Sequence, residues 1–237
     1  MYHNCMIFIT GDTHGGQAQG YDKLLNHKLN ADDKLVVVGD FGYSFYSPGM
    51  KAYNEHKKWS SWLEEQPFTT FFIDGNHENF EALALLPEID LLGGRVGKAS
   101  DKLFHLKRGQ IYTIEGKTFF TFGGAISPDK NNRTPGVDWF PQEEPNFMEY
   151  KNGLDTLDKA GNKVDYILTH EAGTTIRASL TRHDPYHLCS FIDMVLNTTE
   201  FTHHYFGHHH RDQTFGKSTC LYRSIIELPS VLDTPAN

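Results

Sequence analysis

The sequence predicts an α/β fold with a mixed central β-sheet and two sheets packed together. Short runs rich in β-branched and aromatic residues recur along the chain, and some, such as LVVV, are apolar without interruption. Uninterrupted apolar runs are typical of strands buried on both faces. Segments with apolar residues at helical spacing lie between these runs, and a hairpin pattern occupies the middle of the chain.

The predicted strands each end in a polar loop. Strands of four to six residues fit the runs MIFIT, KLVVV, TTFFI, KVDYILT and FTHHYF. The loops that follow them begin GDTHGG, GDFG, DGNHENF, HEAG and GHHHRD. The tail 218–229, STCLYRSIIELP, is predicted as one further strand.

Helices are predicted over 51–67, 79–89 and 146–163. In the first of these, Pro67 closes the segment, and an apolar stripe facing the core is formed by Tyr53, His56, Trp59, Trp62 and Leu63. The segment 103–125 contains two alternating runs that flank Glu115-Gly116, which predicts a hairpin. The loop 127–146 is long and rich in Pro and Asn, and long loops in compact domains are often functional.

Composition narrows the classes of function. The chain has 237 residues, is 38% hydrophobic and 22% charged, and carries a formal net charge of −8, so we expect one domain over residues 1–237. An acidic chain does not attract nucleic acid or anionic membranes through its overall field. No apolar run is long enough for a membrane span, and the first residues do not form a signal peptide. We therefore expect a cytoplasmic protein whose three cysteines are buried and inert.

Side chains that can bind metal gather where the predicted strands end. They are Asp12, His14, Asp40, Asn76, His170, His208 and His210. Ligands bind beyond the carboxyl ends of strands in open α/β sheets, so we expect these side chains to meet at one edge. Each loop alone also fits an ordinary polar turn or a core histidine, and only the joint pattern favours a site.

The donors are carboxylate oxygen, amide oxygen and imidazole nitrogen, with no thiolate. This set suits Zn, Mn or Fe better than Ca or Mg alone. Seven donors exceed the needs of one tetrahedral ion and fit two ions about 3.5–4 Å apart that share a carboxylate.

With these loops the sequence resembles the calcineurin-like metallophosphoesterases. The five motifs of that family read here GDTH, GDFG, GNHE, LTHE and GHHH, between residues 10 and 210. The resemblance implies a four-layer α/β/β/α sandwich with two mixed β-sheets and a dinuclear centre of transition-metal ions (Mn, Fe or Zn). It also implies that Asp40 bridges the ions, that Asp12, His14 and His210 hold the first, and that Asn76, His170 and His208 hold the second.

The middle histidine of the HHH run is predicted not to bind metal. The family motif G-H-x-H uses the outer two histidines, here His208 and His210. In extended backbone successive side chains point to opposite faces, so we expect His209 to point away from the site.

The family pattern is broken after the bridging carboxylate. Many relatives, including the Ser/Thr protein phosphatases, carry Asp and Arg where this chain has Tyr43 and Ser44. Activity like that of the protein phosphatases or the dinucleoside-tetraphosphate hydrolases is therefore less expected. Arg133, in the loop 127–146, is a candidate replacement that would bind the substrate phosphate.

The predicted function is a dinuclear phosphoesterase, a phosphatase or phosphodiesterase that attacks its ester with a metal-bridging hydroxide. His77 is the predicted catalytic residue, which protonates the leaving oxygen or stabilises the transition state. A small-molecule phosphate ester is the expected substrate. A nuclease of the same fold and a non-catalytic metal-binding scaffold are the alternatives, the first weakened by the acidic charge and the second by the complete motif set.

Overall fold

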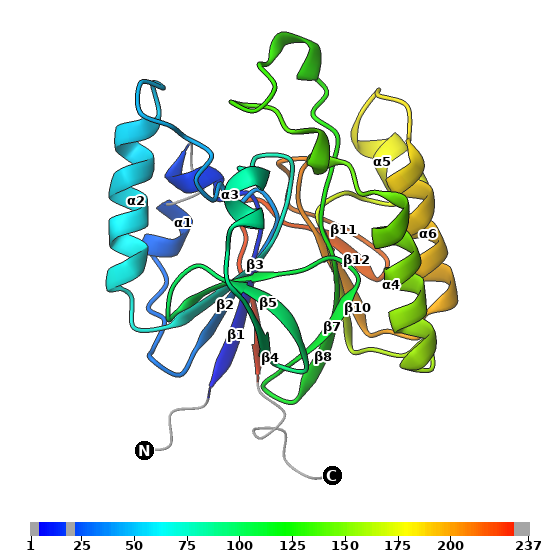
Figure 1. Ribbon diagram of the computed structural model, residues 1–237. Helices are drawn as coiled ribbons and strands as arrows, with labels where there is room; N and C mark the ends of the chain where they lie inside the picture. The colour runs from blue at the N-terminus through cyan, green and yellow to red at the C-terminus, as the bar shows by residue number, and fades with distance from the viewer. Residues whose placement is uncertain (1–4, 18–21, 230–237) are drawn as a thin grey trace.

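A computed structural model describes residues 5–17 and 22–229. The chain forms a four-layer α/β/β/α sandwich, in which two mixed β-sheets pack face to face between two layers of helices (Figure 1). The fold class predicted from the sequence is confirmed. In the part of the chain that the structure describes, no helix has the length and apolar character needed to cross a lipid bilayer.

The first sheet has seven strands with a parallel centre. Its strands are, in order, β13 (Ile226–Pro229), β1 (Met6–Thr10), β2 (Lys34–Val38), β3 (Thr69–Ile73), β6 (Leu103–Leu106), β5 (Gly94–Lys98) and β4 (Glu88–Leu91). β1, β2, β3 and β6 are parallel, whereas β13, β5 and β4 pair antiparallel with their neighbours. One outer face is covered by α1 (Asp22–Leu25), α2 (Tyr53–Glu65) and α3 (Phe80–Ala84).

The second sheet repeats this plan with six strands. Its strands are β11 (Gln213–Phe215), β12 (Ser218–Cys220), β10 (His203–Phe206), β9 (Tyr166–Thr169), β8 (Lys117–Phe122) and β7 (Gln110–Ile114). The four strands from β12 to β8 are parallel, and β11 and β7 are antiparallel edges. Helices α4 (Phe147–Lys159), α5 (Thr174–Leu180) and α6 (His187–Thr198) lie on its outer side.

Strand β2 shows why an uninterrupted apolar run is needed here. Val36 and Val38 face the second sheet in the central core, while Leu35 and Val37 pack under the helices of the outer layer. Because successive side chains point to opposite faces, a strand between two cores must be apolar at every position. Full burial of each such side chain contributes roughly 1.5–3 kcal/mol.

Most predicted elements are confirmed, with shifted ends. The five motif strands, the helix over α2 and the hairpin β7–β8 around Glu115-Gly116 are present. In α2 the buried side chains are His56, Trp59 and Leu63, while Tyr53 and Trp62 are half-buried. Helix α4 starts from the capping box of Asn146 and Glu149.

Three local predictions were wrong. The tail 218–229 is two strands rather than one, because a turn at 221–225 carries the chain from β12 in the second sheet to β13 in the first. The segment 103–125 begins with β6 of the first sheet, so only its later part is the hairpin. The helix predicted over 79–89 ends at Ala84, and strand β4 begins at Glu88.

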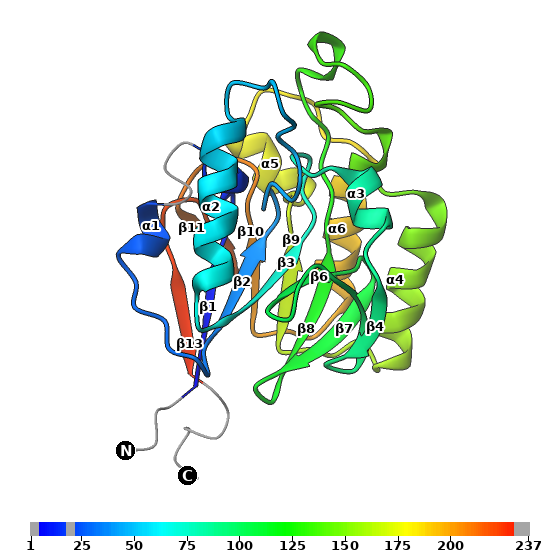
Figure 2. The same ribbon diagram turned by 60° about the vertical axis from the view of Figure 1, so that its left-hand side comes forward.

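The two sheets deliver their parallel strands to a common edge (Figure 2). The loops after β1, β2 and β3 in one sheet, and after β9 and β10 in the other, all leave at this edge. The loop 127–146 rises over the same edge and is drawn in green at the top of Figure 1. The fold therefore collects the five motif loops in one place.

Candidate metal centre

The motif loops have unusual backbone geometry at the predicted ligands. Nine described non-glycine residues have a positive φ, and five of them are Asp12, His14, Asp40, His208 and His210. Left-handed backbone in such residues costs about 1–3 kcal/mol each and persists only where the surrounding structure holds it. Strain of this kind is concentrated at functional sites, which supports the choice of these loops.

Two motif glycines are required by close packing inside the centre. A Cβ on Gly39 would collide with the ring of His170, and a Cβ on Gly75 would collide with the carboxylate of Asp40. The glycines that precede Asp40 and Asn76 therefore allow the loops after β2, β3 and β9 to approach one another.

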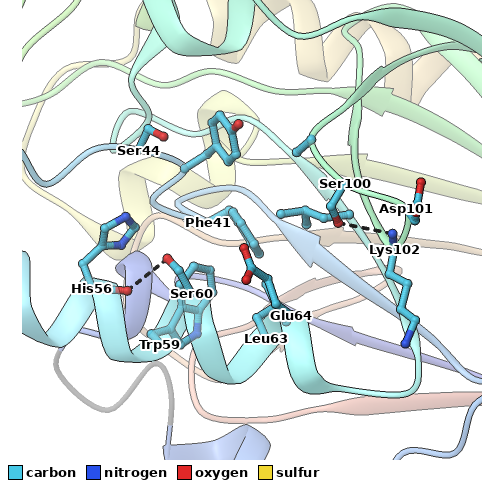
Figure 3. A pocket seen from close by; sticks show the side chains of 13 residues that line it. Phe41, Ser44, His56, Trp59, Ser60, Leu63, Glu64, Ser100, Asp101 and Lys102 are labelled. Atoms are coloured by element: carbon cyan, nitrogen blue, oxygen red, sulfur yellow. Dashed lines mark hydrogen bonds between the residues drawn. The ribbon is translucent and has the colours of Figure 1, made fainter.

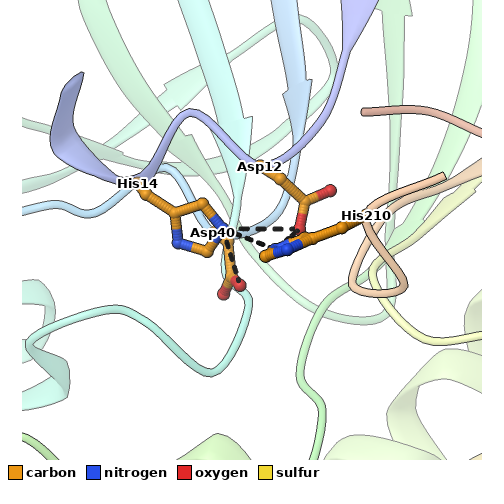
Figure 4. A group of neighbouring side chains, drawn as sticks. All are labelled: Asp12, His14, Asp40 and His210. Carbon is orange, nitrogen blue, oxygen red and sulfur yellow. Dashed lines mark hydrogen bonds and ion pairs between the residues drawn. The ribbon is translucent and has the colours of Figure 1, made fainter. Parts of the chain in front are cut away.

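The structure brings one group of four predicted ligands together (Figure 4). Donor atoms of Asp12, His14, Asp40 and His210 all lie within 4.8 Å of one another. His14 Nε2 is 2.8 Å from His210 Nε2 and 3.8 Å from both Asp12 Oδ1 and Asp40 Oδ2. Two imidazole nitrogens and two carboxylates that converge in this way form a pocket of electron pairs suited to a cation.

A second group shares Asp40 with the first. Donor atoms of Asp40, His170 and His208 also lie within 4.8 Å of one another. Asp40 Oδ1 is 3.2 Å from His170 Nε2, while its Oδ2 faces His14. One carboxylate thus lies between two groups of donors, which is the arrangement expected of a bridging ligand.

Two predicted ligands, His170 and Asn76, each have a buried polar atom without a hydrogen-bond partner in the described structure. His170 Nδ1 lies 2.9 Å from the carbonyl oxygen of Val38, which can only accept, so Nδ1 carries a proton and Nε2 is the nitrogen that faces Asp40 and the centre. The two atoms without a partner are His170 Nε2 and Asn76 Oδ1. Buried polar atoms without a hydrogen-bond partner fit a site at which they bind cations.

The buried carboxyl groups of the centre, Asp12 and Asp40, also favour the binding of cations. Burial opposes ionisation of Asp12 and Asp40, but the neighbouring histidines outweigh it and lower the pKa of both carboxyl groups. Burial likewise disfavours charge on His170, yet the adjacent Asp40 raises its pKa to about 10. Two buried carboxylates therefore attract positive charge, and bound metal ions would supply it.

His77 and Arg133 lie side by side next to these groups. His77 Nε2 is 3.3 Å from Arg133 Nη2, and its backbone N–H donates to Asp40 Oδ1 over 2.8 Å. Burial is the main cause that lowers the pKa of His77 to about 3. Arg133 is held by Asp129, 2.8 Å from its Nε, and by the carbonyl of Asp138.

The partner that relatives place after the bridging carboxylate has no equivalent here. The Tyr43 ring stacks on Phe72 at 5.9 Å between centroids and is half-buried. With Phe41, Trp59 and Leu63 it lines a separate cavity of about 460 Å³ beside α2 (Figure 3). Among the described residues, no carboxylate hydrogen-bonds the ring of His77.

His209 belongs to neither group of donors. Its Nε2 is 2.7 Å from Glu171 Oε1. The reason given from the sequence was wrong, because His208 and His210 have φ values of 66° and 50° and do not lie in extended backbone. The left-handed turns, rather than the alternation of a strand, direct the three rings of the run to different partners.

Three buried carboxylates around the centre have structural roles that the sequence did not predict. Glu78, in the GNHEN loop, accepts from the backbone N–H groups of Phe41, Gly42 and Tyr43 over 2.6–3.0 Å and so holds the loop that follows Asp40. Glu171 and Glu143 hold other parts of the centre. The positions of Glu78 in GNHE and of Glu171 in LTHE offered a signal, whereas Glu143 lies outside the motifs and its contacts are made by distant segments.

A cleft of about 510 Å³ opens over the centre. It is lined by the predicted ligands Asp40, Asn76, His208 and His210, by His77, and by the cationic side chains of Arg133, Arg177 and Arg211. Clefts of this size accommodate small-molecule ligands. The structure therefore places all the sequence-predicted site residues at one centre, with Asn76, His77 and Arg133 on the wall of the cleft.

The fold and this centre define a class of metal-binding α/β/β/α proteins, and comparison with known sequences narrows it. The sequence model of the calcineurin-like phosphoesterase family matches residues 6–212, so the chain belongs to this family. Lariat debranching enzyme from Saccharomyces cerevisiae is 26% identical over 184 residues, which are 70% of this chain. The matched stretch spans 43% of the yeast enzyme. Among solved structures, phosphopantetheinyl hydrolase from Mycobacterium tuberculosis aligns with a TM-score of 0.48 and 13% identity over 92% of this chain and 88% of its own.

Proposed function

We propose that this protein hydrolyses a small-molecule phosphate ester with the help of two transition-metal ions, Mn, Fe or Zn. The observation that carries the proposal is the position of Asp40, whose two oxygens face separate groups of donors. Asp12, His14 and His210 would hold the first ion, and Asn76, His170 and His208 the second. Ions bound there would lower the pKa of a coordinated water and offset charge on the phosphoryl oxygens.

The protein's own residues would bind and orient the ester. The Arg133 guanidinium faces the cleft beside His77, where its N–H groups can bind a non-bridging phosphate oxygen. The ion pair with Asp129 holds the long side chain in place before substrate arrives. Arg133 would thus replace the arginine that relatives carry where this chain has Ser44.

His77 would act on the leaving oxygen. Its ring is neutral in the substrate-free protein because burial disfavours its charged form. A bound phosphate ester brings negative charge next to the ring, which favours the protonated state and lets His77 donate a hydrogen bond or a proton. Asp40 already favours the charged ring, but burial outweighs it. Among the described residues no carboxylate hydrogen-bonds the ring of His77, so the charge of the substrate would add to that of Asp40.

A nuclease of the same fold is the second candidate. The observation in its favour is that Arg133, Arg177 and Arg211 all line the cleft of an otherwise acidic chain. Arg177, however, is paired with Glu171 at 2.6 Å, so its charge is already offset. A small phosphate ester therefore remains the better fit, in a cytoplasmic setting as predicted from the sequence.

Hydrolysis of a panel of esters by Mn-loaded protein tests the proposal. The panel covers phosphomonoesters, phosphodiesters, cyclic nucleotides and single-stranded DNA, and the Asp40→Asn variant prepared in parallel measures any contaminating activity. Metal-dependent hydrolysis of a small ester by the wild-type protein alone is the expected result. Cleavage confined to DNA would favour the nuclease, and no difference from Asp40→Asn on any ester would contradict a catalytic role.

A further inference from the structure

The orientation of the Asn76 side chain decides which of its atoms faces the metal position. An amide presents an oxygen acceptor on one side and an NH2 donor on the other, and only the oxygen binds a metal ion. Asn76 Nδ2 is 3.1 Å from Ser127 Oγ, and Oδ1 is buried without a hydrogen-bond partner in the described structure. The amide therefore directs its donor side to Ser127 and leaves the oxygen for the centre.

Ser127 is held in turn by Glu143. The Ser127 backbone N–H donates to Glu143 Oε1 and its hydroxyl donates to Oε2, both over 2.7 Å. Ser127 and Glu143 are each only 1% exposed. An O–H to carboxylate distance of this length is characteristic of a charge-assisted hydrogen bond.

The protons available to the hydrogen bonds between Glu143, Ser127 and Asn76 determine the orientation of the Asn76 amide. Burial raises the pKa of Glu143 above its ordinary value, and in its ionised state this carboxylate offers only acceptors. A serine hydroxyl has a single proton, which the ionised Glu143 takes. Ser127 Oγ can then only accept from Asn76, so it contacts the NH2 side and not the oxygen. A flipped amide would bring two acceptors together and turn its N–H groups towards the second group of donors.

We propose that Ser127 and Glu143 are positioning residues that lock the Asn76 amide with its oxygen towards the second metal position. This inference rests on the proposed dinuclear function. Glu143 lies on a 3₁₀ turn (Pro141–Glu143) at the end of the long loop, 67 residues beyond Asn76, so the loop that supplies Arg133 also sets the donor atom of a ligand. Outer partners of metal ligands typically change metal affinity 10–100-fold when they are replaced.

The decisive variant is Glu143→Gln, which keeps the shape of the side chain and reverses one hydrogen bond. The glutamine oxygen still accepts from the Ser127 N–H, but its NH2 group donates to Ser127 Oγ. The Ser127 proton is then free to turn towards Asn76, which stabilises the flipped amide. Glu144→Gln, the same change one residue along on an exposed side chain, is the matched control.

The measurement is a calorimetric Mn²⁺ titration of the metal-free proteins, with the Mn EPR spectrum as a second readout of paired ions. In Glu143→Gln we expect the second ion to bind roughly 10–100-fold more weakly while the first binds as in the wild type. We expect the spectrum at two equivalents to lose its coupled signal. Ser127→Ala should weaken the second ion less, because its amide can still turn to suit the metal, and Ser127→Thr should restore wild-type binding. Glu144→Gln should match the wild type.

Three results would overturn the inference. The first is a second ion that binds Glu143→Gln and Ser127→Ala within twofold of the wild type. The second is an equal loss of affinity for both ions, which indicates general damage; should Glu143→Gln fail to fold, the comparison of Ser127→Ala with Ser127→Thr decides alone. A wild-type protein that takes up only one ion would remove the proposed dinuclear function as well, whereas two ions bound with wild-type affinity in every variant would remove only the positioning role.

Discussion

His209 Nε2 lies 2.7 Å from the Oε1 of Glu171, a fully buried carboxylate next to the predicted ligand His170. The other oxygen of Glu171 accepts from Arg177 over 2.6 Å and from the Tyr186 hydroxyl over 2.9 Å. The middle ring of the histidine run is thus part of a buried hydrogen-bond network that supports the loops after β9 and β10. This gives His209 a structural task distinct from that of its two neighbours.

Replacement of His209 separates these tasks. We expect His209→Ala to retain two Mn ions per chain and to lose roughly 1–3 kcal/mol of unfolding free energy, because Glu171 loses a buried partner. His210→Ala, its neighbour, should lose metal instead. Elemental analysis and urea denaturation of the two variants provide the comparison. Metal loss in His209→Ala as severe as in His210→Ala would show that His209 is a ligand.

Asp40→Asn should be the most damaging change of a single ligand. Both groups of donors use this carboxylate, and the substitution removes the negative charge that they share. We expect two ions per chain in the wild type, at most one in the variant, and a fall in activity of more than roughly 100-fold, beyond the usual effect of losing an outer partner. Metal analysis after reconstitution checks this, and one ion in the wild type would contradict a dinuclear centre.

His77→Ala should keep both ions and lose activity. The loss should be larger for esters whose leaving oxygen needs a proton. Alkyl phosphates need a proton at the departing oxygen, so we expect a loss of roughly 10²–10⁴-fold for them. Nitrophenyl phosphates leave readily without one and should be affected less. Steady-state rates for both ester types give the ratio, and equal losses would leave an electrostatic role rather than proton donation.

Arg133→Ala should impair substrate binding. A charged hydrogen bond to phosphate contributes about 1.5–3 kcal/mol, so we expect KM to rise roughly 10-fold or more. Lys130→Ala is the control, because Lys130 is an exposed cation of the same loop. If both variants raise KM equally, the effect comes from the general charge of the loop rather than from Arg133.

Acid should destabilise the metal-free protein through His204. This ring is fully buried between Thr169 Oγ1, at 2.8 Å, and Ser218 Oγ, at 3.0 Å, and burial lowers its pKa to about 3. The unfolded chain takes up the proton near pH 6.5 and the folded one does not, so stability is full above 6.5 and falls as the pH drops towards 3.

The size of the effect follows from the same shift. At pH 5 His204 should cost about 2 kcal/mol relative to pH 7.5, since each pH unit below 6.5 contributes about 1.4 kcal/mol. Urea denaturation of the wild type and of His204→Gln at both pH values isolates this contribution from that of the other histidines. A wild-type loss on acidification no larger than that of the variant would contradict it.

The sequence by itself determined the class of fold, and it predicted seven ligands and the edge at which the structure brings them together. These follow from local patterns, because an uninterrupted apolar run such as LVVV must lie between two layers and a polar loop must leave at its end. It did not reveal that the tail divides between two sheets, because short runs such as STC and IELP carry no sign of which strand they will pair with.

Only the tertiary structure decided how the donor atoms are directed. Asn76 and Ser127 are 51 residues apart, and His209 and Glu171 are 38 residues apart, so neither pair leaves a periodic signal in the chain. The left-handed backbone at His208 and His210 is strained, and only the packing of neighbouring loops holds it. Which side chains gather is thus set by local sequence, whereas the atoms they present are set by buried hydrogen bonds between distant segments.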